Sequence, residues 1–88
     1  MRKDYIVTYD IVNPKRLTKL ARELEKSAMR VQYSVFMLSS VSKNELFAII
    51  DKINMIIDIE ADDVRIYKIV DPGIALARAV NLNDPFIF

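Results

Sequence analysis

Five stretches of the chain carry a regular pattern of hydrophobic and polar positions, three with the period of a strand and two with the period of a helix. The strand-like stretches are rich in β-branched and aromatic residues and cover residues 4–10, 30–38 and 64–70. The alternation of strands and helices predicts an α+β domain with both helices on one face of a sheet. The opposite face then needs cover, which a second copy of the chain could provide.

Each of the two helical stretches begins with a cap. Asn13 and Pro14 predict the start of the first helix, because Asn accepts hydrogen bonds from free amides and proline suits the first helical position. Ser42 and Glu45 have the spacing of a capping box at the start of the second helix. Hydrophobic residues then recur on the buried sides: Leu17, Leu20, Ala21, Leu24 and Ala28 in the first helix, and Leu46, Ile49, Ile50, Ile53 and Ile57 in the second.

The middle strand-like stretch has one polar face. Arg30, Gln32 and Ser34 occupy alternate positions, and Phe36 continues the same face. A row of polar side chains is unusual in a hydrophobic core, and it suits a face of a sheet that contacts a protein partner or phosphate groups. No turn residue interrupts positions 31–38, so the pattern alone predicts one continuous strand.

The composition describes one small domain, residues 1–88, with more hydrophobic content than a lone chain of this size hides comfortably. Of its 88 residues, 52% are hydrophobic, and short chains bury only a modest fraction of their surface. Some of that surface is therefore expected to meet a partner. The formal net charge is only +1, so affinity for nucleic acid would have to come from the placement of the charges.

The chain contains neither cysteine nor histidine. This composition excludes disulfides, thiolate ligands, imidazole bases and ordinary zinc sites. Carboxylates remain as metal ligands, and oxygen ligands favour Mg²⁺ or Mn²⁺. The first residues lead directly into a mixed strand without a long apolar stretch, which predicts a cytoplasmic protein with no membrane contact.

Asp10 is the leading candidate for catalysis and for metal binding. It ends the first strand just before a helix cap, and a two-fold dimer could bring two copies together around one divalent ion. Two carboxylates on such an ion could help to activate water and stabilise phosphoryl charge during phosphodiester hydrolysis. The position alone favours a structural role, in which Asp10 complements the positive N-terminus of the helix.

Cationic and hydroxyl side chains near these elements are candidates for contacts with nucleic acid. Arginine can grip a phosphate through two parallel hydrogen bonds, and a basic helix surface, which Arg22 extends, can follow a backbone or simply be solvated. The candidates are Tyr9, Lys15, Arg16, Lys19, Arg30, Ser34 and Arg65. The acidic residues of 58–63, by contrast, lack the spacing of a calcium loop and are predicted to form a solvated turn.

Three segments of the chain together resemble the Cas2 family, the small adaptation subunit of CRISPR systems. They are Tyr9-Asp10-Ile11, Arg30 to Phe36, and Asp63 to Tyr67. The segments follow the order and spacing of the family over about residues 4–70, and this match favours Asp10 as a metal ligand. The resemblance departs at Met37, where the family commonly has an acidic residue, and it is weak after Pro72.

The resemblance implies a ferredoxin-like βαββαβ fold with an antiparallel sheet and two helices on one face. Residues around 30–40 would then form two adjacent strand pieces. The resemblance also implies a homodimer, with Gln32 and Phe36 at the interface. Residues 72–88 would form a C-terminal segment that contacts the dimer or a partner, with a last strand that can cross to the other sheet.

The resemblance further implies partners and a cofactor. The homodimer would join copies of the integrase subunit Cas1 and support duplex DNA captured as a new spacer. Some members of the family cleave RNA or DNA with a divalent metal, which implies Mg²⁺ or Mn²⁺ on Asp10 and single-stranded RNA as a further substrate.

The sequence is also compatible with two other classes of protein. A stand-alone metal-dependent ribonuclease of the related VapD-like toxin group would require Asp10 but no integrase partner. A regulatory module that binds a small ligand fits less well, because the single glycine, Gly73, leaves no glycine-rich loop.

Overall fold

The computed structural model describes residues 1–70 and gives them an α+β fold with the element order βαββαβ. The elements are β1 (Lys3–Asp10), α1 (Pro14–Glu25), β2 (Met29–Gln32), β3 (Val35–Val41), α2 (Lys43–Ile56) and β4 (Asp63–Ile69). This order confirms the ferredoxin-like architecture that the resemblance implied. The predicted roles of residues 72–88, including an exchanged C-terminal strand, lie outside the described residues.

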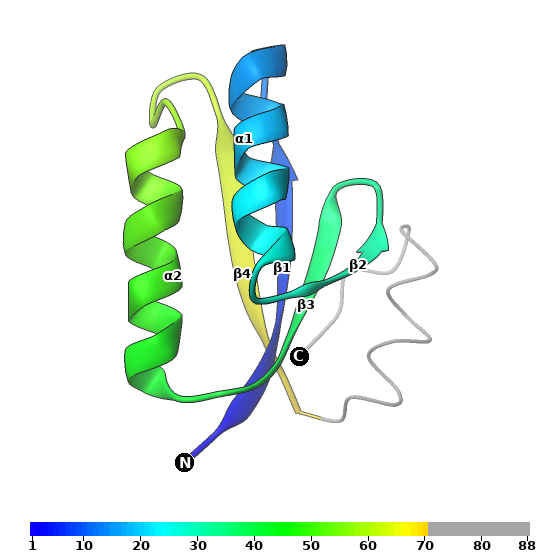
Figure 1. The fold of residues 1–88 in the computed structure, drawn as a ribbon, viewed down its shortest axis with the longest axis vertical. Coiled ribbons are helices and arrows are strands. Elements are labelled where there is room, and N and C mark those ends of the chain that lie inside the picture. Colours follow the sequence, from blue (N-terminus) through cyan, green and yellow to red (C-terminus); the bar gives the residue numbers. More distant parts are fainter. Residues whose placement is uncertain (71–88) are drawn as a thin grey trace.

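The described strands form one antiparallel sheet in the order β2-β3-β1-β4 (Figure 1). The central strand β1 is hydrogen-bonded to β3 on one side and to β4 on the other. Val7 of β1 lies opposite both Phe36 of β3 and Ile66 of β4, so these three side chains share one face. At the end of β1, Asp10 lies opposite Asp63 of β4.

Both helices pack on the same face of this sheet (Figure 1). Their apolar stripes meet inward-facing strand residues such as Val7 and Leu38 in the main hydrophobic core. Burial of apolar surface, at about 25 cal/mol per Å², is the dominant favourable term that holds such layers together. A second, smaller cluster lies on the opposite face of the sheet and consists of Ile6, Val35, Met37 and Ile69.

The predicted helix caps are confirmed. The Asn13 side chain accepts hydrogen bonds from the N–H groups of Lys15 and Arg16, at 2.9 and 3.1 Å, and a proline opens α1. Ser42 and Glu45 form the reciprocal capping box of α2, with bonds of 2.7 and 3.1 Å. Neither helix within residues 1–70 has the length and apolar character needed to span a membrane.

The prediction of one continuous middle strand, made from the pattern alone, is wrong, whereas the two adjacent strand pieces that the resemblance implied are confirmed. A turn at Tyr33 and Ser34 separates β2 from β3, and the two strands form an antiparallel hairpin. Because the chain reverses there, Arg30 lies directly opposite Phe36. The Tyr9 N–H donates to the Ser34 carbonyl at 3.2 Å, which ties the turn to β1. Since the turn lacks the Gly and Asn residues that favour tight hairpins, this tertiary contact helps to position it.

Candidate nucleic-acid and metal site

Asp10 lies at one end of the sheet, on the face away from the helices. It is the last residue of β1, it is exposed, and alternation along the strand places it on the same side as Ile6. Within residues 1–70 its carboxylate makes no hydrogen bond or ion pair. The helix that follows is capped by Asn13 instead. The Asp10 carboxylate is therefore available to a ligand.

Residues of β4 line the same face beside Asp10. Its cross-strand neighbour, Asp63, accepts a hydrogen bond from Arg65 Nε at 3.2 Å, and Arg65 lies opposite Thr8. A hydrogen bond with Tyr67 and the nearby charge of Asp63 raise the pKa of Arg65, so the guanidinium stays charged. Asp10 thus lies next to the carboxylate of Asp63, and the cation of Arg65 follows two residues further along β4.

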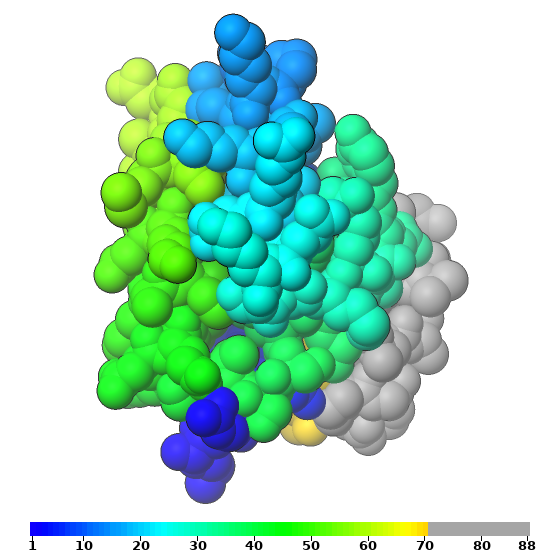
Figure 2. All heavy atoms as spheres, viewed as in Figure 1, coloured from blue at the N-terminus to red at the C-terminus, as the bar shows by residue number. Residues whose placement is uncertain are grey.

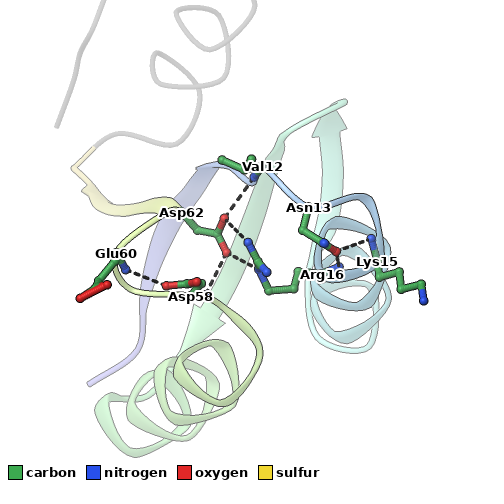
Figure 3. Close-up of polar contacts among 7 residues, drawn as sticks. All are labelled: Val12, Asn13, Lys15, Arg16, Asp58, Glu60 and Asp62. Carbon is green, nitrogen blue, oxygen red and sulfur yellow. Dashed lines mark hydrogen bonds and ion pairs between the residues drawn. The ribbon is translucent and has the colours of Figure 1, made fainter.

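A partly buried ion pair holds the loop that follows Asp10 (Figure 3). Arg16 Nε and Nη2 donate to the two carboxylate oxygens of Asp62 at 2.7 and 3.1 Å. The same carboxylate accepts from the backbone N–H groups of Val12 and Asp58 at 3.1 and 2.9 Å, and the Asp62 side chain is 0% exposed. We call the contacts among these four residues the Asp62 clasp. The clasp joins the β1–α1 loop to the α2–β4 loop.

The donors around Asp62 keep its carboxylate charged. The hydrogen bond from Arg16, helped by the N–H groups of Asp58 and Val12, holds the pKa of Asp62 well below its usual range against the opposing effect of burial. The prediction that the acidic residues of 58–63 form a solvated turn is therefore wrong for Asp62. It holds for Asp58 and Glu60, which are exposed and joined by a hydrogen bond of 3.0 Å.

On the helix side of the sheet, the guanidinium of Arg30 lies against two aromatic rings. Its guanidinium carbon lies 5.0 Å from the centre of the Phe36 ring and 5.8 Å from the centre of the Tyr33 ring. Tyr9 stacks on Phe36 with ring centres 6.1 Å apart. Burial raises the pKa of Tyr9, and a hydrogen bond with Arg30 partly offsets this effect. These contacts fix the direction of the Arg30 side chain.

Phe36 does not fit its predicted place at a dimer interface. The side chain is 0% exposed within a single chain and belongs to the core beneath the helices, so it has no surface to offer to a second copy. Gln32 is half-buried opposite Val35, and its role at an interface stays a prediction. Ser34, also half-buried, lies in the hairpin turn.

The exposed cations among the predicted nucleic-acid residues lie on two different surfaces, and Tyr9 is buried in the core. Lys15 and Lys19 are exposed on α1, and Arg30 is exposed on β2 on the same side, whereas Arg65 lies on the opposite face with the carboxylates. Arg16 contacts Asp62 through two of its nitrogens. The predicted residues thus do not form one continuous surface, and their contact with nucleic acid stays a prediction.

These features define a small ferredoxin-like α+β protein with two neighbouring carboxylates at one end of its sheet. A family model described as CRISPR associated protein Cas2 matches residues 3–74. The chain therefore belongs to the Cas2 family, as the resemblance in its sequence indicated.

Relatives with assigned names match most of the chain. A protein of Nitrosomonas europaea, named CRISPR-associated endoribonuclease Cas2 1, is 39% identical over 71 residues, which cover 81% of this chain and 67% of the relative. A protein of Thermodesulfovibrio yellowstonii, named CRISPR-associated endoribonuclease Cas2 2, is 36% identical over 86 residues, which cover 96% of this chain and 89% of the relative.

Solved structures share the fold. The hypothetical protein TT1823 from Thermus thermophilus superposes with a TM-score of 0.76 at 31% identity, covering 81% of this chain and 85% of that chain. Streptococcus pyogenes Cas2 at pH 6.5 gives a TM-score of 0.68 at 28% identity, covering 97% and 99%. A chain of a partial Cas6-RT-Cas1–Cas2 complex gives 0.70 at 30% identity, covering 84% and 79%.

Proposed function

We propose that this chain acts in CRISPR adaptation as a cytoplasmic homodimer that binds duplex DNA and bridges copies of the integrase subunit Cas1. Membership of the Cas2 family supports this role, as does the similarity to a chain of a solved complex that contains Cas1 and Cas2. We propose metal-dependent hydrolysis of RNA or DNA phosphodiesters as a second activity. The names of the two relatives, both endoribonucleases, support that activity.

One observation carries the nuclease part of the proposal: Asp10 is an unpaired carboxylate in fixed surroundings. Its carboxylate makes no hydrogen bond or ion pair within residues 1–70, yet the loop that begins after it is held to the α2–β4 loop through Val12 and Asp62. A catalytic carboxylate contributes most when its position is set before the substrate arrives. The clasp holds the loop after Asp10 in place and makes no hydrogen bond with the Asp10 carboxylate itself.

The donor set at this end of the sheet fits Mg²⁺ or Mn²⁺. Asp10 and Asp63 offer hard oxygen ligands from neighbouring strands, and Mg²⁺ is commonly held by one or two carboxylates together with water and substrate phosphate. Within residues 1–70 no group of three or more metal-binding side chains forms a complete site, so further ligands would come from water, substrate or the Asp10 of a second copy. Bound there, the ion would polarise a phosphoryl oxygen and neutralise developing charge.

Basic residues near this end of the sheet would hold the substrate. Arg65, oriented by Asp63 and Tyr67, would contact a phosphate oxygen beside the carboxylates, because a guanidinium matches phosphate geometry. Lys15 is exposed in the first turn of α1, and it follows the end of β1 by only a few residues. Contacts from Lys15 and Lys19 would fix the position of a longer duplex without reading its sequence.

We place the dimer interface on the face that carries Asp10. This face holds the second apolar cluster, which includes Val35, and Gln32 pairs with Val35 at its border. A two-fold axis through such a face brings the same residues of both copies together. The two copies of Asp10 would then approach each other, which agrees with a shared divalent ion.

Cleavage and binding should be measured in the same samples. We would compare wild type, Asp10→Asn and the control Asp51→Asn, an exposed aspartate on α2. Labelled duplex DNA and single-stranded RNA would be incubated with Mg²⁺, Mn²⁺ or chelator at two salt concentrations. We expect metal-dependent cleavage that falls on the order of 100-fold in Asp10→Asn and persists in Asp51→Asn. Duplex binding should weaken with salt in all three proteins.

Two outcomes would change the proposal. If neither substrate is cut while salt-sensitive duplex binding persists, Asp10 is structural and the protein is an adaptor without nuclease activity. If RNA cleavage needs Asp10 while the protein neither binds duplex DNA nor co-purifies with Cas1, the chain is a stand-alone ribonuclease, like the VapD-like toxins.

A further inference from the structure

A pocket lies between α1 and the β2–β3 hairpin, on the helix side of the sheet. Its volume is about 290 Å³, and Figure 2 shows the surface of α1 (cyan) bordering that of the hairpin (teal). The activities proposed for Asp10 do not use this pocket. Its polar lining consists of Tyr9, Thr18, Arg22, Glu25, Arg30 and Tyr33.

Two arginines line this pocket, one from each wall. Arg22 is exposed in the last turn of α1, and Arg30 projects from β2. Arg30 is ordered in advance, because it lies against the rings of Phe36 and Tyr33 and its charge interacts with the Tyr9 hydroxyl. A side chain that is already ordered loses less entropy when it binds an anion. Two arginines that line one cavity are suited to a phosphate group.

Tyr33 gives the pocket an exposed aromatic surface. The residue is 72% exposed, although the Arg30 guanidinium lies against its ring. Its backbone is held in place, because the Tyr9 hydroxyl donates to the Tyr33 carbonyl at 3.4 Å. An exposed aromatic ring in the lining of a cavity that also holds two arginines can stack on a nucleobase of any sequence.

Glu25 narrows the class of ligand. A carboxylate in the lining weakens the binding of a bare anion, whereas it can accept a hydrogen bond from a ribose hydroxyl or a base amino group. The pocket therefore suits a ligand that has an anionic group, a flat ring and hydrogen-bond donors. Its volume is near the lower end of ligand sites, which begin at roughly 300 Å³, and this size suits one nucleotide but not a duplex.

We propose that this pocket binds a single unpaired nucleotide, with the phosphate between Arg22 and Arg30 and the base against Tyr33. The nucleotide can be free or can be part of a single-stranded chain. The pocket is separate from the carboxylate site, because Tyr9 and Asp10 point to opposite faces of β1. An occupied pocket would hold an unpaired nucleotide at the hairpin while Asp10 stays accessible.

The test uses binding in the presence of chelator, so that no cleavage takes place. Wild-type protein labelled with ¹⁵N would be titrated with adenosine and uridine monophosphates, inorganic phosphate, a 5′-phosphorylated single-stranded pentamer and a blunt duplex. Nucleotides should shift the amide signals of the hairpin and the last turn of α1. We expect Tyr33→Ala and Arg22→Ala each to weaken nucleotide binding about tenfold. The matched controls Phe47→Ala and Lys43→Ala, both at exposed positions on α2, should change it less than about twofold.

The comparison of ligands identifies the source of the nucleotide and can overturn the proposal. Equal affinity for the monophosphates and the pentamer indicates a free nucleotide, whereas tighter binding of the pentamer indicates a single-stranded chain; either result supports the pocket. The proposal fails if inorganic phosphate binds as tightly as the nucleotides, or if Tyr33→Ala binds nucleotides like wild type. It also fails if the duplex produces the same shifts as the pentamer. Because the readout needs neither metal nor Asp10, such a failure is distinct from failure of the proposed nuclease.

Discussion

Asp10 and Asp62 are two carboxylates at the same end of the sheet with opposite surroundings. Asp10 is exposed and its carboxylate makes no hydrogen bond or ion pair within residues 1–70, whereas the Asp62 side chain is covered and accepts four hydrogen bonds. Two carboxylate oxygens offer about four acceptor positions, so Asp62 has no capacity left for a metal or a substrate. Saturation by donors, and not acidic character alone, therefore separates the structural aspartate from the one available for chemistry.

The two carboxylates are also connected. Val12 lies two residues after Asp10 and donates its N–H to Asp62. The clasp thus holds the backbone from which Asp10 projects, while Arg16 extends the same contact into α1. Changes at Asp62 should therefore act on stability first, and changes at Asp10 should act on chemistry alone.

The largest effect is expected for Asp62→Ala. The substitution leaves the Arg16 guanidinium without its partner and removes the acceptor of two backbone N–H groups, those of Val12 and Asp58. We expect Tm to fall by about 10 °C or more, because a charge and two amides lose their partners. Asp10→Asn should change Tm by less than about 2 °C. Thermal unfolding followed by circular dichroism measures both.

Arg16→Lys is the matched variant for this prediction. Lysine keeps the charge but cannot make the two parallel hydrogen bonds of arginine, so Tm should fall, although less than in Asp62→Ala. If Arg16→Lys leaves Tm unchanged and weakens only duplex binding, Arg16 is a phosphate contact, as its sequence position suggested. The clasp would then not order the loop after Asp10.

The separation along the sequence between two contacting residues decides whether their contact could be predicted from the sequence. Asn13 and Ser42 satisfy amides within their own turn of helix, so their residue types and spacing are sufficient. The hairpin turn at Tyr33 has no such local signal and depends on a hydrogen bond from β1. The clasp joins residues 46 positions apart, and no motif pairs Arg16 with Asp62.

The same reasoning applies to the candidate site. Asp10 could be identified because it ends a strand within a recognisable segment. The surroundings of Arg30 could not, since the hairpin must form before Arg30 lies opposite Phe36. The exposure of Tyr33 and its contact with Arg30 could not be predicted either, because both exist only once the turn has formed.

A smaller effect is expected at acid pH. The pKa of Asp62 is lowered in the folded chain, so its contribution to stability is complete above its ordinary pKa of 3.8 and is lost as the pH falls below that value. The urea midpoints of wild type and Asp62→Asn should therefore differ by a constant amount from about pH 7 to pH 5, and the difference should shrink below about pH 4. A difference that is the same at pH 2.5 and pH 7 would show that Asp62 is not held in its charged form. Asn54→Ala, at an exposed position of α2, serves as the control.

The surroundings of Asp63 are intermediate between those of Asp10 and Asp62, because its carboxylate is exposed but accepts a hydrogen bond from Arg65. Asp63→Asn should have the smallest effect on the fold. The substitution removes a like-charge pair across the strands from Asp10 but also loses the contact with Arg65, and each term is small at an exposed position. We expect Tm to change by less than about 2 °C. If Asp63 assists Asp10 in holding a metal, the Mn²⁺ concentration that gives half-maximal cleavage should rise about threefold or more, with the saturated rate within about twofold of wild type. A saturated rate as low as that of Asp10→Asn would instead make Asp63 an equal partner in the chemistry, because added metal could not replace what the second carboxylate supplies.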